Sequence, residues 1–271
     1  MILCDLSQAD TKIVSDYVSL EPELNLFISG DVESFGIDGR HVRVKGLFDV
    51  ADALSGVLLR YMDRNYVFYS RREKIPGELI ADSILADNPA LKGVCLNGKA
   101  SLIRQIAPFL PSLKEEVTMM ARCDKARPLS RPAPSEAFVR PLKEADFHEY
   151  FSLIGTISEF SRSQKNEEKE RNDWIANLKR GSVAYGVFVE GGLLALASST
   201  ADTADSAMLV GVCTKEGFRR RGYASLAVSA LLEDRFMKGD RFVCLFYDNP
   251  LAGRIYHKFG FVDVAPFTML H

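Results

Sequence analysis

The sequence predicts a mixed α/β fold that is built as two similar halves. The chain has 271 residues, a normal length for two domains. The segment CDKARPLSRPAPSEA, at 123–137, carries three prolines among serine and charged residues, which is typical of an interdomain linker. On both sides of it, helical and strand patterns follow one another in a matching order. We therefore expect a first domain at 1–123, a linker at 124–135 and a second domain at 136–271.

The second half has the clearer pattern and predicts the order β-α-α-β-β-β-α-β-α-β. A helix at 166–181 has an acidic first turn, a basic last turn and Gly181 as its stop. A later helix begins with Asn249 as its cap and Pro250 in its first turn. The remaining elements follow from apolar runs or apolar residues at helical spacing. In order, the predicted elements are 137–142, 143–160, 166–181, 183–190, 193–200, 205–214, 222–236, 241–247, 249–260 and 261–270, the last of which closes the second domain.

The first half predicts the order α-α-β-β-β-α-β-α-β from fainter patterns of the same kind. Because the element order matches that of the second half, we expect two copies of one fold. An unrelated α/β cap domain is the alternative, since the halves show no evident sequence identity. In order, the predicted elements are 8–20, 22–36, 41–50, 53–62, 65–70, 75–87, 94–96, 99–109 and 116–123.

Composition indicates a cytoplasmic globular protein. Hydrophobic residues make up 47% of the chain and the net charge is −2, so a general affinity for nucleic acid or an anionic membrane is not expected. The first residues do not resemble a signal peptide, and no apolar run has the roughly 20 residues of a membrane span. Metal or disulfide frameworks are not expected either, because the cysteines are scattered and odd in number. They are Cys4, Cys95, Cys123, Cys213 and Cys244.

Three arginines precede a predicted helix in the stretch GVCTKEGFRRRGYASLAV, at 211–228. A helix N-terminus already carries partial positive charge, so Arg219, Arg220 and Arg221 are unfavourable there unless an anion binds. A strand, a short loop and a helix starting at Gly222 also form a typical phosphate site, because unpaired N–H groups gather there. A solvated charged loop is the alternative explanation for the arginine run taken alone.

The spacing Arg219-x-x-Gly222-x-Ala224 after a strand resembles the acyl-CoA signature of the GNAT N-acetyltransferase superfamily. The segment NPLAGRIYHKFGF, at 249–261, resembles the second conserved segment of the same superfamily. The predicted element order is also similar to that fold, and the resemblance covers residues 136–271. The chain is most similar to bacterial tandem GNAT proteins, whose N-terminal half is a degenerate copy that lacks the CoA loop, so we expect one active site per chain.

The resemblance implies acetyl-CoA as the cofactor. The strand before the loop then offers backbone groups to the pantetheine arm, the loop amides hold the diphosphate, and Asn249 borders the thiol. The implied cofactor-binding residues are Val212, Cys213, Thr214, Arg219, Arg220, Arg221, Gly222, Tyr223, Ala224, Ser225 and Asn249.

The resemblance also implies that Tyr256 is the catalytic residue. It lies four residues after the small Ala252, on the same face of the predicted helix. A phenol has a pKa of about 10 and a thiol one of about 8.5, so Tyr256 is able to hydrogen-bond or protonate a leaving thiolate while staying protonated at neutral pH. A tyrosine packed in the core under Phe261 is the alternative.

The general base is left open. Many relatives have a glutamate on the strand before the loop, and SAMLVGVCT, at 206–214, offers no carboxylate. Asp202, Asp205 and Glu159 are weak candidates, and we expect the two aspartates in a polar turn. A water held by backbone carbonyls is an equal alternative.

Two other signals do not indicate function. GVCLNGKAS, at 93–101, nearly spells a P-loop, but Ala100 stands where a Ser or Thr is needed. The histidines have no ligand spacing, so neither a metal nor a Ser-His-Asp triad is expected. They are His41, His148, His257 and His271.

The function expected from the sequence is an acetyl-CoA-dependent N-acetyltransferase that acts by direct attack of a primary amine. The acceptor is a small molecule or a peptide, and the protein is a monomer or a homodimer. A non-catalytic acyl-CoA sensor is the main alternative. An aminoacyl transferase of paired GNAT-like folds is a third, disfavoured by the acidic net charge.

Overall fold

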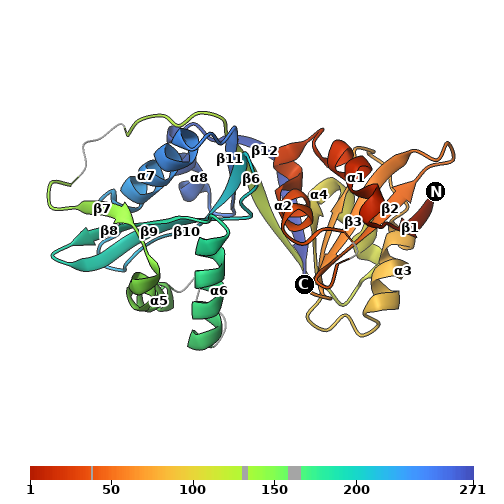
Figure 1. Cartoon of the computed structure of the whole chain (residues 1–271), viewed down its shortest axis with the longest axis horizontal. Coiled ribbons are helices and arrows are strands. Elements are labelled where there is room, and N and C mark those ends of the chain that lie inside the picture. Colours follow the sequence, from red (N-terminus) through yellow and green to blue (C-terminus); the bar gives the residue numbers. More distant parts are fainter. Residues whose placement is uncertain (38, 130–133, 158–165) are drawn as a thin grey trace. The chain divides into compact units, whose positions relative to one another are not determined.

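The computed structural model of the chain describes residues 1–37, 39–129, 134–157 and 166–271 (Figure 1). It divides into two compact units. The first unit comprises Met1–Met120 together with Asp263–His271, and the second comprises Ala121–Val262. Most of the expected linker, apart from residues 130–133, lies within the described part of the second unit.

The first unit begins with a short strand that the sequence analysis did not predict. This strand, β1 (Ile2–Asp5), pairs antiparallel with β2. With β1 included, the element order of this half is β-α-α-β-β-β-α-β-α-β, the order predicted for the second half. The remaining elements are α1 (Thr11–Val18), α2 (Leu26–Phe35), β2 (Val42–Phe48), β3 (Leu54–Tyr61), β4 (Asn65–Tyr69), α3 (Gly77–Asp87), β5 (Cys95–Lys99), α4 (Ala100–Ile106) and β6 (Glu115–Cys123).

The last strand of the chain, β12 (Val262–Leu270), completes the sheet of the first unit. It pairs antiparallel with β5, from Phe267 opposite Lys99 to Leu270 opposite Leu96. The expectation that this strand closes the second domain is therefore wrong. Its apolar pattern correctly predicted a strand, but such a pattern is local and carries no information about which sheet the strand joins.

The second unit has the element order that the sequence predicted up to β12. Its sheet has the order β11-β10-β9-β8-β7, in which β10 and β11 are parallel and the other neighbours antiparallel. Its elements are β7 (Phe138–Pro141), α5 (Phe147–Gly155), α6 (Glu167–Lys179), β8 (Ala184–Val189), β9 (Gly192–Thr200), β10 (Ser206–Thr214), α7 (Tyr223–Met237), β11 (Phe242–Tyr247) and α8 (Pro250–Lys258).

Helices cover both faces of this second sheet, as Figure 1 shows for α7 on one side and α5 and α6 on the other. Successive residues of a strand point to opposite faces. On β9, Ala195 and Ala197 pack in the core with α7, whereas Leu196 packs in the core with α5 and α6. The carboxyl ends of β10 and β11, from which α7 and α8 start, lie at one edge of the sheet.

Candidate functional site

The loop between β10 and α7 leaves backbone amides available to a ligand. Helix α7 begins at Tyr223 with Gly222 as its N-cap, and no side chain caps it. The amide of Leu226 donates to Gly222 O at 3.1 Å. The amides of Tyr223, Ala224 and Ser225 have no recorded acceptor in the described part of the chain. First-turn amides of this kind form a ready anion site.

The backbone of this loop holds that site open. Gly222 has φ +92°, in the left-handed region that favours glycine, and a Cβ added to it would meet no atom within 4 Å. Arg220 also has a positive φ, +66°, although it is not glycine. Such strain costs on the order of 1–3 kcal/mol and clusters at ligand clamps and active sites.

All three arginine side chains of the loop are exposed. Arg219 Nε donates to Thr214 O at 3.4 Å, which ties the loop to the end of β10. The guanidinium of Arg221 lies 5.3 Å from the centre of the Phe218 ring. The cations therefore flank the amides of the first turn, where charge-assisted hydrogen bonds to an anion are strongest.

Tyr223 meets this site through its backbone and not its side chain. Its ring is buried, and its hydroxyl donates to Glu136 Oε1 at 2.8 Å. This hydrogen bond raises the pKa of Tyr223. The pKa of Glu136 is lowered, first because its carboxylate accepts a hydrogen bond from the backbone N–H of Glu136 itself, and also because it accepts the one from Tyr223. The contact fixes the start of α7 against the segment before β7, which the sequence analysis did not foresee.

The two parallel strands part beside the loop. Their register runs from Ser206 opposite Phe242 to Leu209 opposite Leu245. Both strands continue beyond it, β10 to Thr214 and β11 to Tyr247. The predicted cofactor-binding residues of β10, at 212–214, lie in this separated part. The side chain of Cys213 packs in the core with α5 and α6, so only its backbone could serve a ligand there.

A bulge deforms β10 where it separates from β11. Its register with β9 shifts between Val210 and Cys213, and Gly211 has φ +63°. A Cβ on Gly211 would come within 2.8 Å of Ser198 Oγ, a hydroxyl that donates to Val210 O. This bulge was not predicted from the sequence, although a glycine inside a strand pattern is its usual signal.

Helix α8 places Asn249 and Tyr256 near the end of β11. Asn249 is the N-cap, and its Oδ1 accepts from Leu251 N at 2.9 Å. The Tyr256 ring lies between Tyr247 and Phe261, with centroid distances of 6.2 and 5.9 Å. Burial raises the pKa of Tyr256 to about 12, so the phenol stays protonated at neutral pH.

Comparisons with known proteins bear on this geometry. The model of the family described as FR47-like protein matches residues 184–266. A GCN5-related N-acetyltransferase from Sphaerobacter thermophilus superposes with a TM-score of 0.69 at 13% identity, over 99% of this chain and 94% of the other. A tandem GNAT protein from the clavulanic acid biosynthesis pathway, described as without AcCoA, gives 0.61 at 14% identity, over 99% and 97%.

The chain has the GNAT fold. The resemblance that the two motifs indicated is thereby confirmed at the level of the fold, including the tandem arrangement. A Drosophila protein is also similar, with a TM-score of 0.71 and 13% identity over 99% of this chain and 97% of the other. No curated protein matches the sequence.

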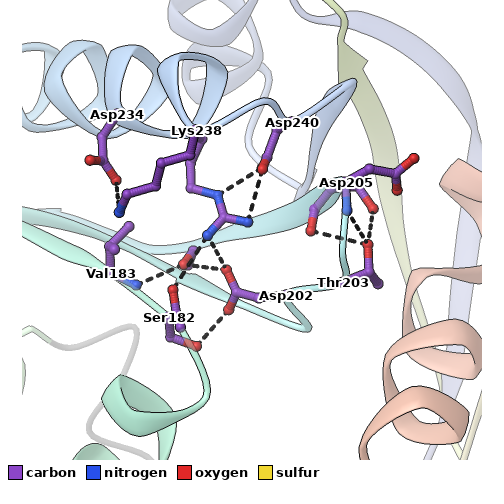
Figure 2. A network of polar contacts seen from close by, with 12 residues as sticks. Ser182, Val183, Asp202, Thr203, Asp205, Asp234, Lys238 and Asp240 are labelled. Carbon is purple, nitrogen blue, oxygen red and sulfur yellow. Dashed lines mark hydrogen bonds and ion pairs between the residues drawn. The ribbon is translucent and has the colours of Figure 1, made fainter.

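Two of the three weak candidates for a base have structural roles. Asp202 and Asp205 lie in the turn between β9 and β10, as expected, and Figure 2 shows both in a polar network. Asp202 accepts from the hydroxyls of Ser182 and Ser199 and pairs with buried Arg235 at 2.9 Å. Asp205 pairs with Arg241 at 3.2 Å. The third candidate, Glu159, lies outside the described residues.

The segment at 93–101, whose sequence is close to a P-loop, contains the strand β5. Gly98 and Lys99 belong to β5, so their backbone pairs with neighbouring strands and cannot surround a phosphate. Among the residues described, no group of three or more His, Cys, Asp or Glu side chains is placed to hold a metal ion. No helix in the described ranges has the length and apolarity needed to cross a membrane.

Proposed function

We propose that the protein is an acetyl-CoA-dependent N-acyltransferase that transfers an acetyl group to a primary amine. The observation that carries the proposal is the first turn of α7, where three amides without recorded acceptors in the described residues stand beside three exposed arginines. This set fits a diphosphate in charge and in donor chemistry. The proposal is supported by the sequence of this loop, since 219–224 follow β10 and carry the spacing that resembles the acyl-CoA signature.

In this proposal, different residues of the second unit bind the cofactor and interact with its thiol. The amides and arginines at 219–225 hold the diphosphate, and the separated part of β10, at 212–214, offers backbone groups to the pantetheine arm. When bound, the thioester supplies the activated acyl group. Tyr256 stays protonated at neutral pH because burial raises its pKa to about 12, so its hydroxyl is available to donate a hydrogen bond to the leaving thiolate.

The amine must be neutral to attack, and an alkylammonium has a pKa of about 10.4. β10 carries no carboxylate that could remove the proton. Both aspartates of the adjoining turn are held in ion pairs. We therefore propose that solvent, or a water held by backbone carbonyls, takes the proton.

The same observation supports a second candidate, an acyl-CoA-binding sensor that does not catalyse transfer. Both candidates require the cation-flanked amides, and only the first requires Tyr256. Turnover of acetyl-CoA in the presence of amines separates them, because a sensor binds the thioester and leaves it intact.

Replacement of Gly222 tests the binding site, and the other end of α7 offers a matched control. Gly239 follows that end with φ +104°, and a Cβ there also meets nothing within 4 Å. Gly222→Ala and Gly239→Ala therefore introduce similar backbone strain, on the order of 1 kcal/mol. We expect calorimetry to show roughly tenfold or greater loss of CoA affinity for Gly222→Ala, a difference of about 1.4 kcal/mol, and none for Gly239→Ala. Equal affinities for the two variants, or no CoA binding by the parent protein, contradict the proposed site.

A further inference from the structure

A cavity of about 190 Å³ lies on the α5 and α6 face of the second sheet. Helices α5 and α6 form one wall, through Tyr150, Trp174 and Asn177, and the strands form the other, through Ser198, Thr200 and Val210. A cavity of about 150 Å³ is enough to hold a benzene ring. The space therefore admits a ring-sized group.

The cavity reaches the bulge of β10. Val210, the residue at which the register shift begins, is part of its lining. Ser198, also in the lining, donates its hydroxyl to Val210 O at 3.2 Å. The separated part of β10, which the proposed function assigns to the acyl-bearing arm, starts at this same point. A molecule seated in the cavity is thus next to the strand along which the thioester is proposed to lie.

Those lining residues that the structure describes are aromatic, aliphatic or polar and uncharged. The rings of Tyr150 and Trp174 stack with a centroid distance of 4.2 Å. Burial, with a smaller effect from the negative charge of Glu170, raises the pKa of Tyr150 to about 12, so its hydroxyl remains neutral and able to donate. Within the described ranges, neither this hydroxyl nor Thr200 Oγ1 has a recorded hydrogen-bond partner, and both remain available to a ligand.

One carboxylate, that of Asp202, is hydrogen-bonded to residues of this lining, and both of its oxygens already have partners. Asp202 accepts from Ser182 and Ser199, two lining residues, and its third contact is the ion pair with Arg235 (Figure 2). Arg235 in turn pairs with Asp240 at 2.7 Å. A ligand ammonium would therefore find no unengaged carboxylate in this network, and an ion buried without a partner costs several kcal/mol. The charge of Glu170 on α6 contributes to the raised pKa of Tyr150, and Arg180 donates to Asn177 Oδ1 at 2.6 Å, but neither residue belongs to the described lining of the cavity.

We propose that this cavity receives the non-reacting end of the acceptor amine, and that this end is an uncharged, ring-sized group. This rests on the proposed function for the identity of the reacting end. The uncharged walls do not match an amine whose second end is an ammonium or a carboxylate. Polyamines, and amino acids that react through a side chain, are amines of this kind. An arylalkylamine matches them.

The cavity contains its own probe, because Trp174 is the single tryptophan of the chain. Tryptophan fluorescence is titrated with 2-phenylethylamine, 1,4-diaminobutane and 4-aminobutanoate, both with CoA and without it. We expect a saturable change with 2-phenylethylamine at a Kd about tenfold or more below those of the two charged-tail amines, a difference of about 1.4 kcal/mol. A charged-tail amine that binds equally well, or the absence of any change, overturns the inference.

Two substitutions fill the cavity from opposite walls. Asn177→Phe acts from α6 and Thr200→Phe from β9, so one remains informative if the other fails to fold. Asn172→Phe is the matched control, because Asn172 is exposed on α6 and does not line the cavity. We expect both cavity variants to weaken 2-phenylethylamine binding by about tenfold or more, while Asn172→Phe retains it. Unchanged binding in a folded cavity variant overturns the inference.

Failure of the proposed function is visible separately. If the parent protein takes up no CoA in calorimetry, the transferase and sensor proposals both fail, but the fluorescence titration without CoA still measures what the cavity accepts. If CoA binds and the titration shows no preference for the uncharged amine, only the inference about the acceptor fails.

Discussion

At the scale of single residues, the surroundings of Tyr256 determine what it can do. Its phenol is flanked by Tyr247 and Phe261 and has no recorded hydrogen-bond partner in the described part of the chain. Burial raises its pKa to about 12, which disfavours the charged phenolate. A group of this kind is a neutral hydrogen-bond donor over the whole physiological pH range, and it does not act as a base while it is protonated.

Replacing Tyr256 by Phe removes the donor and keeps the ring packing. We expect kcat to fall by about 10²-fold or more, the range for loss of a general acid, with CoA affinity nearly unchanged. Steady-state kinetics and calorimetry on the same preparation measure the two quantities. Tyr185→Phe on β8 is a control that removes a different phenol of the same unit. A Tyr256→Phe enzyme with full kcat contradicts the proposed role and leaves Tyr256 as a packing residue.

At the scale of elements, a buried ion network joins the end of α7 to the turn between β9 and β10. The Arg235 side chain is 6% exposed and contacts the carboxylates of Asp202 and Asp240, which are 7% and 5% exposed. Arg241 and Asp205 form a second pair in the same region, with exposures of 71% and 43%. The two pairs have the same chemistry in opposite environments.

The difference in burial predicts a difference in stability. Arg235→Met leaves two buried carboxylates without their cation, which costs about 3–5 kcal/mol. Arg241→Met breaks an exposed pair, for which the expected cost is under about 1 kcal/mol. Denaturant unfolding near neutral pH measures both. Similar losses of stability for the two variants would contradict the view that burial, and not the presence of an ion pair alone, determines how strongly each pair stabilises the turn.

The elements show what the sequence could and could not predict. Capping residues and apolar spacing are local signals, and they located α6 and α8 within a few residues of their bounds. β1 was missed because its four residues are mostly exposed and too short for a pattern. The bulge at Gly211 and the bond between Tyr223 and Glu136 depend on contacts between separate segments, and no spacing along the chain encodes them.

The candidate site follows the same division. The two motifs located the cation-flanked loop and Asn249, because both depend on residues close together in sequence. The saturation of Asp202 by Arg235, and the uncharged cavity beside Val210, combine residues from several elements. Such features are visible once the sheet order brings the elements together.

At the scale of the whole molecule, the path of the chain couples the two units. The chain leaves the first unit after Met120 and returns to it at Asp263, after the second unit is complete. Two phenylalanines only eight positions apart therefore belong to different units: Phe259 packs in the core of the second, and Phe267 lies on β12 in the first. Both are almost fully buried.

This arrangement predicts where each substitution acts. Phe267→Ala and Phe259→Ala each create a cavity and cost about 3–5 kcal/mol. We expect Phe267→Ala to speed hydrogen exchange in β4 and β5 of the first unit, and Phe259→Ala to speed it in β10 and β11 of the second. Exchange measured by mass spectrometry at peptide resolution distinguishes the two patterns. Identical patterns for both variants would contradict the assignment of β12 to the first unit.

The return of β12 also has a consequence during biosynthesis. A ribosome delivers residues in order, so the edge of β5 that β12 covers stays open while the entire second unit is being translated. An open strand edge is a template for association with other chains. Slow translation of the codons for the second unit would prolong the exposure of this edge. We therefore expect nascent chains to aggregate through β5, and a chaperone that binds β5 to prevent this.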